Sequence, residues 1–264
     1  MQASSTVDRA IDVLFHLHAQ ERACGVSELG RALGMPRSSV HRLLTTLAHR
    51  GLLERVERGH YRPGLGLMVL GLGALDRQPV AVAARPVLEE QVARFGETVF
   101  LTVAHRGQIR VLDKAEGSGF LRAAPQVGSE VPVHATAVGK LWLAFAPQEV
   151  APASEPPIFT ERTLRGGAAL RAAVEQAHRQ GFAENHGEWI AGLSVVAAPI
   201  LQRRRGDAEP GLEGALALAA PTARLVALGP AQVGRSLKAA ATRVALCLVR
   251  PGARNAAFRR EAQG

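Results

Sequence analysis

Apolar residues recur at helical spacing in the first part of the chain. Val7, Ile11 and Leu14 lie three or four positions apart, which predicts a first helix that ends near Gln20. The segment "ELGRAL" predicts a short second helix, with Ser27 as its N-cap because a serine hydroxyl can accept a hydrogen bond from a first-turn amide. Two short helices are therefore expected to open the chain.

A third helix is predicted from Pro36 to about Arg50, after a tight turn at Gly34. Proline is tolerated where a helix begins because its missing N–H would have no partner there, and Gly51 supplies a C-terminal stop. One face of this helix is apolar and the other is polar, which fits either a solvated surface or a surface that binds a partner. The apolar stripe is Val40, Leu43, Leu44 and Leu47, and the polar face is Arg37, Ser38, Ser39, His41, Arg42 and Thr45.

The segment "LLERVERGHYRPG" predicts a small hairpin whose tip is Arg58, Gly59 and His60. Three short helices followed by a two-stranded hairpin predict a winged helix-turn-helix. The apolar run "LGLMVLGLGAL" at 65–75 continues as a connector helix, and Pro79 marks its end.

From about residue 81 the pattern alternates between strands and helices. The segments "ETVFLTVAHRGQIRVLDKAEG", "LRAAPQVGSEVPVH", "AGLSVVAAPIL" and "GALALAAP" predict strands. Helices are predicted in "AVAARPVLEEQVARFG", "ATAVGKLWLAFAP" and "GGAALRAAVEQAHRQGF", and a last one from about Pro230 to Leu248. This order predicts an α+β domain around an antiparallel sheet.

Charge and cysteine content limit the classes of function that the chain can have. The net charge is +9, and it is uneven: residues 1–80 hold ten Arg against seven acids, residues 81–234 are neutral, and residues 235–264 carry +6. Concentrated positive charge indicates an anionic partner. Cys24 and Cys247 have no metal-ligand spacing, so no metal site is expected and reduced thiols in the cytoplasm are favoured. The N-terminus lacks a signal-peptide pattern and the longest apolar run is too short for a bilayer, so no membrane partner is expected.

At this point the sequence resembles a known family. "VSELGRALGMPRSSVHRLLTTLAHRGLLERVERGHYRPGLGL" resembles the DNA-binding domain of IclR-type bacterial transcription regulators. "GETVFLTV", "VGSEVPVHATAVGK", "QGFAENHGEW" and "GLSVVAAPI" resemble the effector-binding domain of the same family, in the same order, so that the resemblance covers about residues 5–248.

The resemblance implies a winged helix-turn-helix DNA-binding domain at 1–64, a linker helix at 65–80 and a GAF- or profilin-like effector domain at 81–250. A basic tail, 251–264, would follow, with disorder as the default and an accessory phosphate contact as the alternative. The resemblance also implies dimers through the DNA-binding domains and, in many members, tetramers through the effector domains. Repression is the working expectation, although the residues themselves do not distinguish a repressor from an activator.

These implications give the polar face of the third helix a role in binding operator DNA. A recognition helix reads base edges from its N-terminal residues, and Arg can pair with guanine through two hydrogen bonds. The hairpin would reach a phosphate or the minor groove. The expected DNA contacts are Ser27, Arg37, Ser38, Ser39, His41, Arg42, Thr45, Arg58, His60 and Arg62.

The segment "HATAVGK" is the informative part of the second domain. Thr136 can cap a helix whose first-turn amides would suit a carboxylate, although ordinary capping of a core helix explains the same spacing. The resemblance places the effector pocket at Ala137, Val138, Asn185, Glu188, Val195, Ala197 and Ala219, and we expect His134 and Leu193 to line it with them.

The pocket positions depart from the family pattern. Val195 stands where Cys is frequent, Ala217 and Ala219 where Ser is frequent, and Asn185 where Asp is frequent. The resemblance therefore implies a small organic acid with an apolar or aromatic body as effector.

An enzyme is the alternative class, with the basic N-terminal domain docking a protein instead of DNA. No GxSxG, P-loop or HExxH pattern occurs, and Val69 stands where a dinucleotide loop would need its third glycine. His134, Asn185, His186 and Glu188 lack a nearby nucleophile, so no catalytic residue and no cofactor are expected.

Overall fold

A computed structural model describes residues 5–20, 22–118, 126–151, 153, 155–164, 167–203 and 209–248. The chain divides into an N-terminal unit, residues 1–77, and a C-terminal unit, residues 78–264. Each unit is described by itself. The basic tail and the first five residues of the predicted strand segment "LRAAPQVGSEVPVH" lie outside the described residues.

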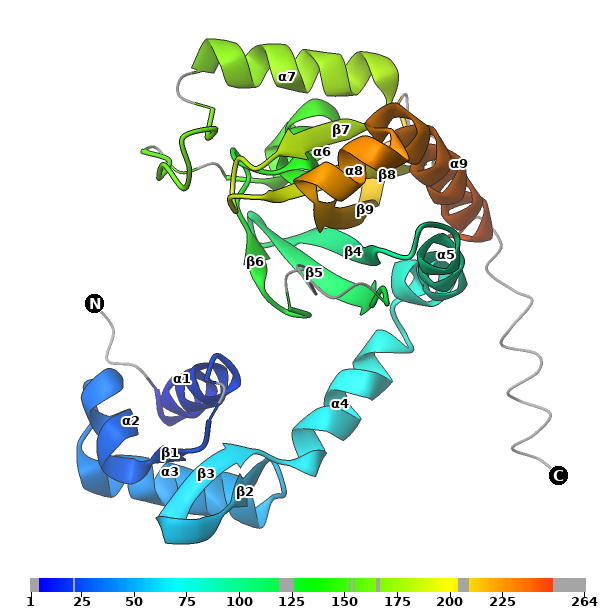
Figure 1. Ribbon diagram of the computed structural model, residues 1–264. Helices are drawn as coiled ribbons and strands as arrows, with labels where there is room; N and C mark the ends of the chain where they lie inside the picture. The colour runs from blue at the N-terminus through cyan, green and yellow to red at the C-terminus, as the bar shows by residue number, and fades with distance from the viewer. Residues whose placement is uncertain are drawn as a thin grey trace, which may run out of the picture. The chain divides into compact units, whose positions relative to one another are not determined.

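The N-terminal unit is a winged helix-turn-helix, as the sequence predicts (Figure 1). Its elements are α1 (Thr6–His18), β1 (Cys24–Gly25), α2 (Val26–Ala32), α3 (Arg37–His49), β2 (Leu53–Arg55), β3 (His60–Pro63) and α4 (Leu65–Leu75). A fully buried leucine contributes about 1.5–3 kcal/mol relative to an exposed one, so the core holds these short elements together. The buried core residues are Val13, Leu17, Cys24, Leu29, Val40, Leu43, Leu44, Leu47, Leu53 and Tyr61.

Three local predictions in this unit need correction. Gly25 is the N-cap of α2, and Ser27 lies inside the first helical turn with no capping hydrogen bond. Pro36 is the N-cap of α3 and precedes its first helical residue. The segment at Cys24, taken from the sequence as a helix break, is a short strand that pairs with β3, so the wing is three-stranded in order β1-β3-β2. Pairing with β3 makes this segment a strand. Two residues are too few to show the alternation of apolar and polar positions that would predict a strand from the sequence.

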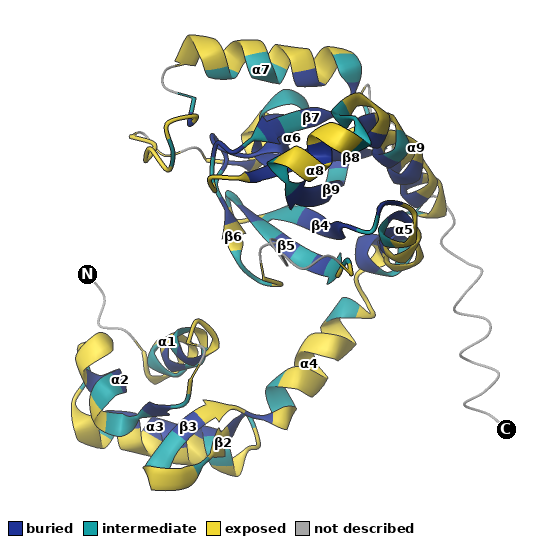
Figure 2. Cartoon of the chain, in the orientation of Figure 1, coloured by how far each residue is buried: buried dark blue, intermediate teal, exposed yellow. Residues whose placement is uncertain are grey.

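The helix α4 is apolar around its whole circumference and largely uncovered within its unit. Its apolar side chains are between 55 % and 70 % exposed at Leu65, Met68, Val69, Leu70 and Leu72. Figure 2 shows this helix mostly in the colour of exposed residues. Among the described residues no single helix is long and apolar enough to cross a membrane; α4 and the following helix reach that length only when taken together.

The C-terminal unit contains a six-stranded sheet in the order β6-β5-β4-β9-β8-β7, and each neighbouring pair is antiparallel. This confirms the predicted α+β class. The strands are β4 (Thr98–His105), β5 (Gln108–Ala115), β6 (Glu130–Val131), β7 (Ala183–His186), β8 (Leu193–Gln202) and β9 (Gly211–Pro221). The helices are α5 (Pro79–Phe95), α6 (Ala137–Phe145), α7 (Gly167–Gln180), α8 (Thr222–Leu228) and α9 (Pro230–Leu248).

Helices cover both faces of this sheet. α5 and α9 pack together against one face, whereas α6 contacts β8, β9 and α7 on the other (Figure 1). Strand side chains alternate between faces, so Val195, Ala197 and Ala219 join the core cluster of α6 while Val196 and Leu218 point to the α5–α9 side. The beginning of α6 therefore lies over a floor of small apolar side chains.

Candidate functional site

The helix α3 separates an apolar stripe from a polar face as the sequence predicts. Val40, Leu43, Leu44 and Leu47 are buried in the core of the N-terminal unit. On the other side Arg37, Ser38, His41, Arg42 and Thr45 are exposed, and Ser39 is half-buried. The polar side chains are thus available to a partner outside the unit.

The first turn of α3 carries positive charge and free donors. Its N-cap is Pro36, which makes no side-chain capping bond to the first-turn amides. Within the described part of the chain, Arg37 and Arg42 make no ion pair or side-chain hydrogen bond. Unsatisfied amides and unpaired guanidinium groups at a helix N-terminus suit phosphate oxygens and base-edge acceptors.

The wing presents a second cationic group. Arg58 lies at the tip, exposed, with a left-handed φ of 57°. Arg62 is also exposed, but its Nε donates to Glu54 Oε2 at 2.9 Å, so its charge is already compensated. His60 is half-buried beside Gly25. Of the predicted wing contacts, Arg58 is the cation that has no partner among the described residues.

Ser27 is exposed on α2, where its carbonyl accepts from Arg31 Nε at 3.5 Å. In the same turn the Arg22 guanidinium hydrogen-bonds to Glu28 and thereby lowers the pKa of that carboxyl. Arg22 is therefore neutralised locally, and its charge does not add to that of α3.

In the C-terminal unit, α6 begins where "HATAVGK" predicts. Thr136 is the N-cap: its Oγ1 accepts from the Gly139 amide at 3.0 Å and donates to the Pro132 carbonyl at 2.7 Å. The amides of Ala137 and Val138 have no partner among the described residues, and both residues are buried. Two unsatisfied amides at the positive end of a helix form a candidate site for a carboxylate.

The structure places the predicted apolar wall next to this turn. Val195 pairs with Ala219 and Ala197 pairs with Ala217 across β8 and β9, and Leu193 belongs to the same cluster. None of these side chains can donate or accept a hydrogen bond. The first turn of α6 and these strand residues therefore share one apolar cluster.

A buried polar cluster borders the same turn, and it contains the predicted residues Asn185 and Glu188 together with Lys140, which was not predicted. Asn185 donates to the Ala135 carbonyl and accepts from the amides of Gly187 and Glu188. Lys140 Nζ donates to Glu188 Oε1 at 2.6 Å and to the Glu184 carbonyl at 2.8 Å. The other carboxylate oxygen, Glu188 Oε2, is buried without a partner among the described residues.

Lys140 was missed by sequence reasoning. The signal that could have found it is a single charged residue inside the otherwise apolar stretch "ATAVGKLWLAFA". A lysine on a helix that is apolar on all sides needs a counter-charge when the helix is buried. Which acid supplies that charge is decided by the fold, because Glu188 is distant in sequence.

His134 faces a different space from the other predicted effector residues. Its Nε2 lies 2.9 Å from the Pro157 carbonyl, and its ring stacks on Phe159 at 5.5 Å between centroids. It borders a cleft that Trp189 also lines and that Ala137, Val138 and the strand residues do not line. The structure thus separates His134 from the α6 amides.

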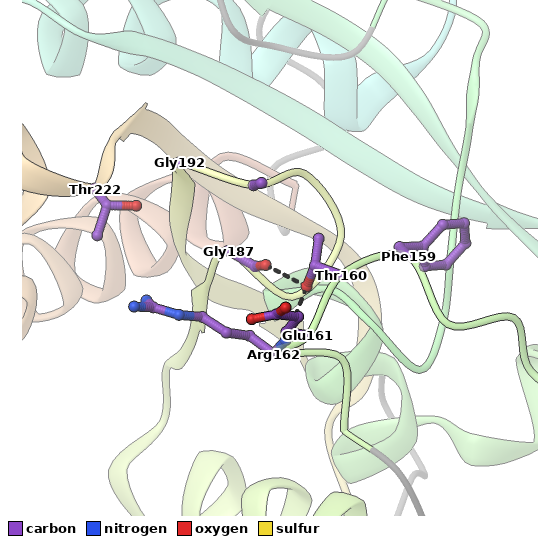
Figure 3. A pocket seen from close by; sticks show the side chains of 8 residues that line it. Phe159, Thr160, Glu161, Arg162, Gly187, Gly192 and Thr222 are labelled. Atoms are coloured by element: carbon purple, nitrogen blue, oxygen red, sulfur yellow. Dashed lines mark hydrogen bonds between the residues drawn. The ribbon is translucent and has the colours of Figure 1, made fainter.

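A second cleft, of about 470 Å³, lies between two loops of the same unit. In Figure 3 the Thr160 hydroxyl points at the Gly187 carbonyl, to which it donates at 2.7 Å, while the Phe159 ring is directed away from Arg162. Thr163 Oγ1 donates to the Glu188 carbonyl at 2.7 Å. These bonds fix the loop that carries the buried carboxylate.

A winged helix with an exposed cationic first turn, followed by an α+β unit, is the architecture of a two-domain transcription regulator. Family comparison agrees: residues 6–57 match the IclR helix-turn-helix domain, and residues 72–246 match the domain described as "Bacterial transcriptional regulator IclR C-terminal". The chain belongs to the IclR family of bacterial transcriptional regulators, with a DNA-binding helix-turn-helix and a C-terminal ligand-binding domain.

Relatives cover most of the chain. The regulator BhcR of Paracoccus denitrificans is 30 % identical over 83 % of this chain and 78 % of its own length. The acetate operon repressor of Salmonella typhimurium is 26 % identical over 91 % and 89 % respectively. An IclR homologue from Microbacterium hydrocarbonoxydans, solved in complex with 4-hydroxybenzoate, superposes with a TM-score of 0.79 at 26 % identity, covering 93 % of this chain and 99 % of that one.

Proposed function

We propose that this chain binds an operator through α3 and the wing, and that a small organic acid bound in the C-terminal unit controls this binding. The observation that carries the proposal is the division of α3 into a core-forming stripe and an exposed first turn with unpaired Arg37 and Arg42. Relatives that are transcription regulators support it, including the repressor from Salmonella.

Arg37 and Arg42 are proposed to read base edges, and Arg58 is proposed to contact a phosphate. Replacing Arg37 or Arg42 by Ala should weaken specific binding by about 1–3 kcal/mol for each lost base contact. Replacing Arg58 by Ala should weaken specific and random DNA alike and lower the salt slope by about one. The measurement is a salt-dependent mobility shift on the DNA that flanks the gene of this protein.

Arg62→Ala is the matched control, because Arg62 is already paired with Glu54. Its effect on the salt slope should be smaller than that of Arg58→Ala. Unchanged operator affinity in both the Arg37 and Arg42 variants would contradict the assignment of α3 as recognition helix.

We propose further that the operator is bound by a dimer formed through the N-terminal units. Two apolar surfaces of this unit lack cover: the α4 residues described above, and Val7, Ile11 and Phe15, which lie four positions apart on α1 and are 66 %, 43 % and 67 % exposed. A second copy would bury both surfaces. The footprint should be an inverted repeat with half-sites about one helical turn apart. Protection of a single half-site would argue against this dimer.

The effector is proposed to be a small acid with an apolar or aromatic body. Its carboxylate would accept from the Ala137 and Val138 amides, and its body would lie against Val195, Ala197 and Ala219. The 4-hydroxybenzoate complex of the Microbacterium relative supports an aromatic acid in this family. Hydroxyl groups of a sugar acid would lack partners at this wall, at a cost of about 1–3 kcal/mol each.

Calorimetry on the whole protein against aromatic, short aliphatic and polyhydroxy acids tests this proposal. Apolar acids should bind most tightly. Val195→Asp should abolish the response to effector and leave operator binding without effector intact, because the N-terminal unit has its own core. Tight binding of a polyhydroxy acid, with no response to any apolar acid, would refute the pocket assignment.

A further inference from the structure

The cleft that His134 borders has the size and chemistry of a separate small-molecule site. Its volume is about 340 Å³, within the range of about 300–1,000 Å³ that is usual for ligand pockets. Aromatic and apolar groups form its walls. The residues that line it are Glu130, Pro132, Val133, His134, Ala151, Ala153, Pro157, Phe159 and Trp189.

His134 lines this cleft and carries one ring nitrogen that is free to accept a hydrogen bond. A carbonyl can only accept, so Nε2 is the nitrogen that donates to Pro157, and a neutral ring keeps Nδ1 as an acceptor. Within the described residues Nδ1 has no hydrogen-bond partner. Part of its surface is open to solvent, so a ligand can reach it. The ring itself is held in place by its stacking on Phe159, with an interplanar angle of 21°.

Trp189 and Phe159 supply flat apolar surfaces beside that acceptor. Trp189 is half-buried and Phe159 is 40 % exposed. Aromatic rings pack favourably in offset or edge-to-face contact with such surfaces. A single aromatic ring is therefore complementary to the walls, and a hydroxyl on that ring is complementary to Nδ1.

Glu130 makes the rim unsuitable for an acid. Its carboxylate is exposed and has no ion-pair partner among the described residues. Arg110 lies opposite Glu130 in the strand register, but its guanidinium donates to the Gly128 carbonyl and to Gln108 instead. No Lys or Arg is among the described residues that line the cleft, so an anionic ligand would find no cation in its walls and a carboxylate at its rim.

We propose that this cleft is a second binding site, distinct from the effector site at α6, and that it takes a neutral single-ring phenol whose hydroxyl donates to His134 Nδ1. The cleft shares none of the α6 amides or of the strand residues assigned to the effector, and its rim selects against acids. The two sites thus differ in the charge of the ligand that they accept.

Calorimetry on the whole wild-type protein compares 4-methylphenol with 4-methylanisole, which has no hydroxyl donor. The phenol should bind at least tenfold more tightly than the anisole, which corresponds to the loss of about one good hydrogen bond. In a Trp142→Phe variant, Trp189 is the sole tryptophan of the chain. Its fluorescence should change with increasing phenol concentration until the site is saturated.

Two variants separate the acceptor from the stacking surface. His134→Phe should abolish the preference for the phenol over the anisole. Phe159→Leu should weaken both ligands and keep the preference. Equal affinity for phenol and anisole in the wild-type protein, or phenol binding that Trp189→Leu leaves unchanged, would overturn the proposal. Because neither outcome involves operator DNA or an acid effector, the proposed function would stand.

Discussion

Replacing Glu188 by Gln is expected to lower the free energy of unfolding of the C-terminal unit by about 3–5 kcal/mol, because it leaves a buried ammonium without its counter-charge. The side chains of Lys140 and Glu188 are 5 % and 9 % exposed, and their charged atoms are 2.6 Å apart. Lys140→Met should cost a similar amount, since Glu188 would then be the uncompensated charge.

The measurement is denaturant unfolding followed by tryptophan fluorescence. Trp142 and Trp189 are the two tryptophans of the chain, so this signal reports on the C-terminal unit alone. The matched control is the double variant Lys140→Met with Glu188→Leu, which removes both charges together. The double variant leaves no buried charge without a partner, and Glu188 Oε2 makes no hydrogen bond among the described residues that would be lost. It should therefore recover most of the unfolding free energy that each single variant loses. Single variants that each cost less than about 1 kcal/mol, the typical value of an exposed pair, would show that the charges are not buried against one another.

Replacing Gly139 by Ala is expected to destabilise the C-terminal unit at or above the upper end of the about 1–3 kcal/mol that overpacking usually costs. A Cβ atom at this position would lie 1.8 Å from the Val133 carbonyl oxygen and 2.5 Å from its carbon. Both are backbone atoms in the turn that leads into α6, so the turn itself would have to move. That movement would also displace the Ala137 and Val138 amides and weaken effector binding.

Gly71→Ala in α4 is the matched control, because nothing beyond the adjacent backbone of the same helix lies within 4 Å of the Cβ that it adds. It should stabilise the helix by about 0.5–1 kcal/mol, as alanine does when it replaces an exposed helical glycine. It should leave the fluorescence transition of the C-terminal unit unchanged. If Gly139→Ala unfolds at the same denaturant concentration as the wild-type protein, the close packing of this turn is not present in solution.

The sequence by itself determined those features that local chemistry specifies. The spacing of Val40, Leu43 and Leu47 defined the buried side of α3, since helical geometry places these positions on one face. Gly51, with φ of 71°, ends that helix as predicted. Thr136 caps α6 as predicted, because the cap and the amide it binds are three residues apart. Each of these signals needs only neighbouring residues.

The tertiary structure decided which distant groups meet. Lys140 and Glu188 are 48 residues apart, and no local pattern specifies their pairing. The strand β7 was not predicted, because "AENH" lacks a clear alternation of apolar and polar residues. Its hydrogen-bonded pairing with β8, and not its own sequence pattern, makes this segment a strand. The same holds for Arg62, whose charge is compensated across the wing by Glu54.

His134 shows most clearly why the sequence alone does not determine which side chains share a site. The sequence places it two residues before Thr136 and therefore suggests a shared site. Its ring is oriented instead by the Pro157 carbonyl and by Phe159, from a loop more than twenty residues downstream. The direction of a side chain near a helix start depends on what packs against it, and only the folded chain brings that loop into contact.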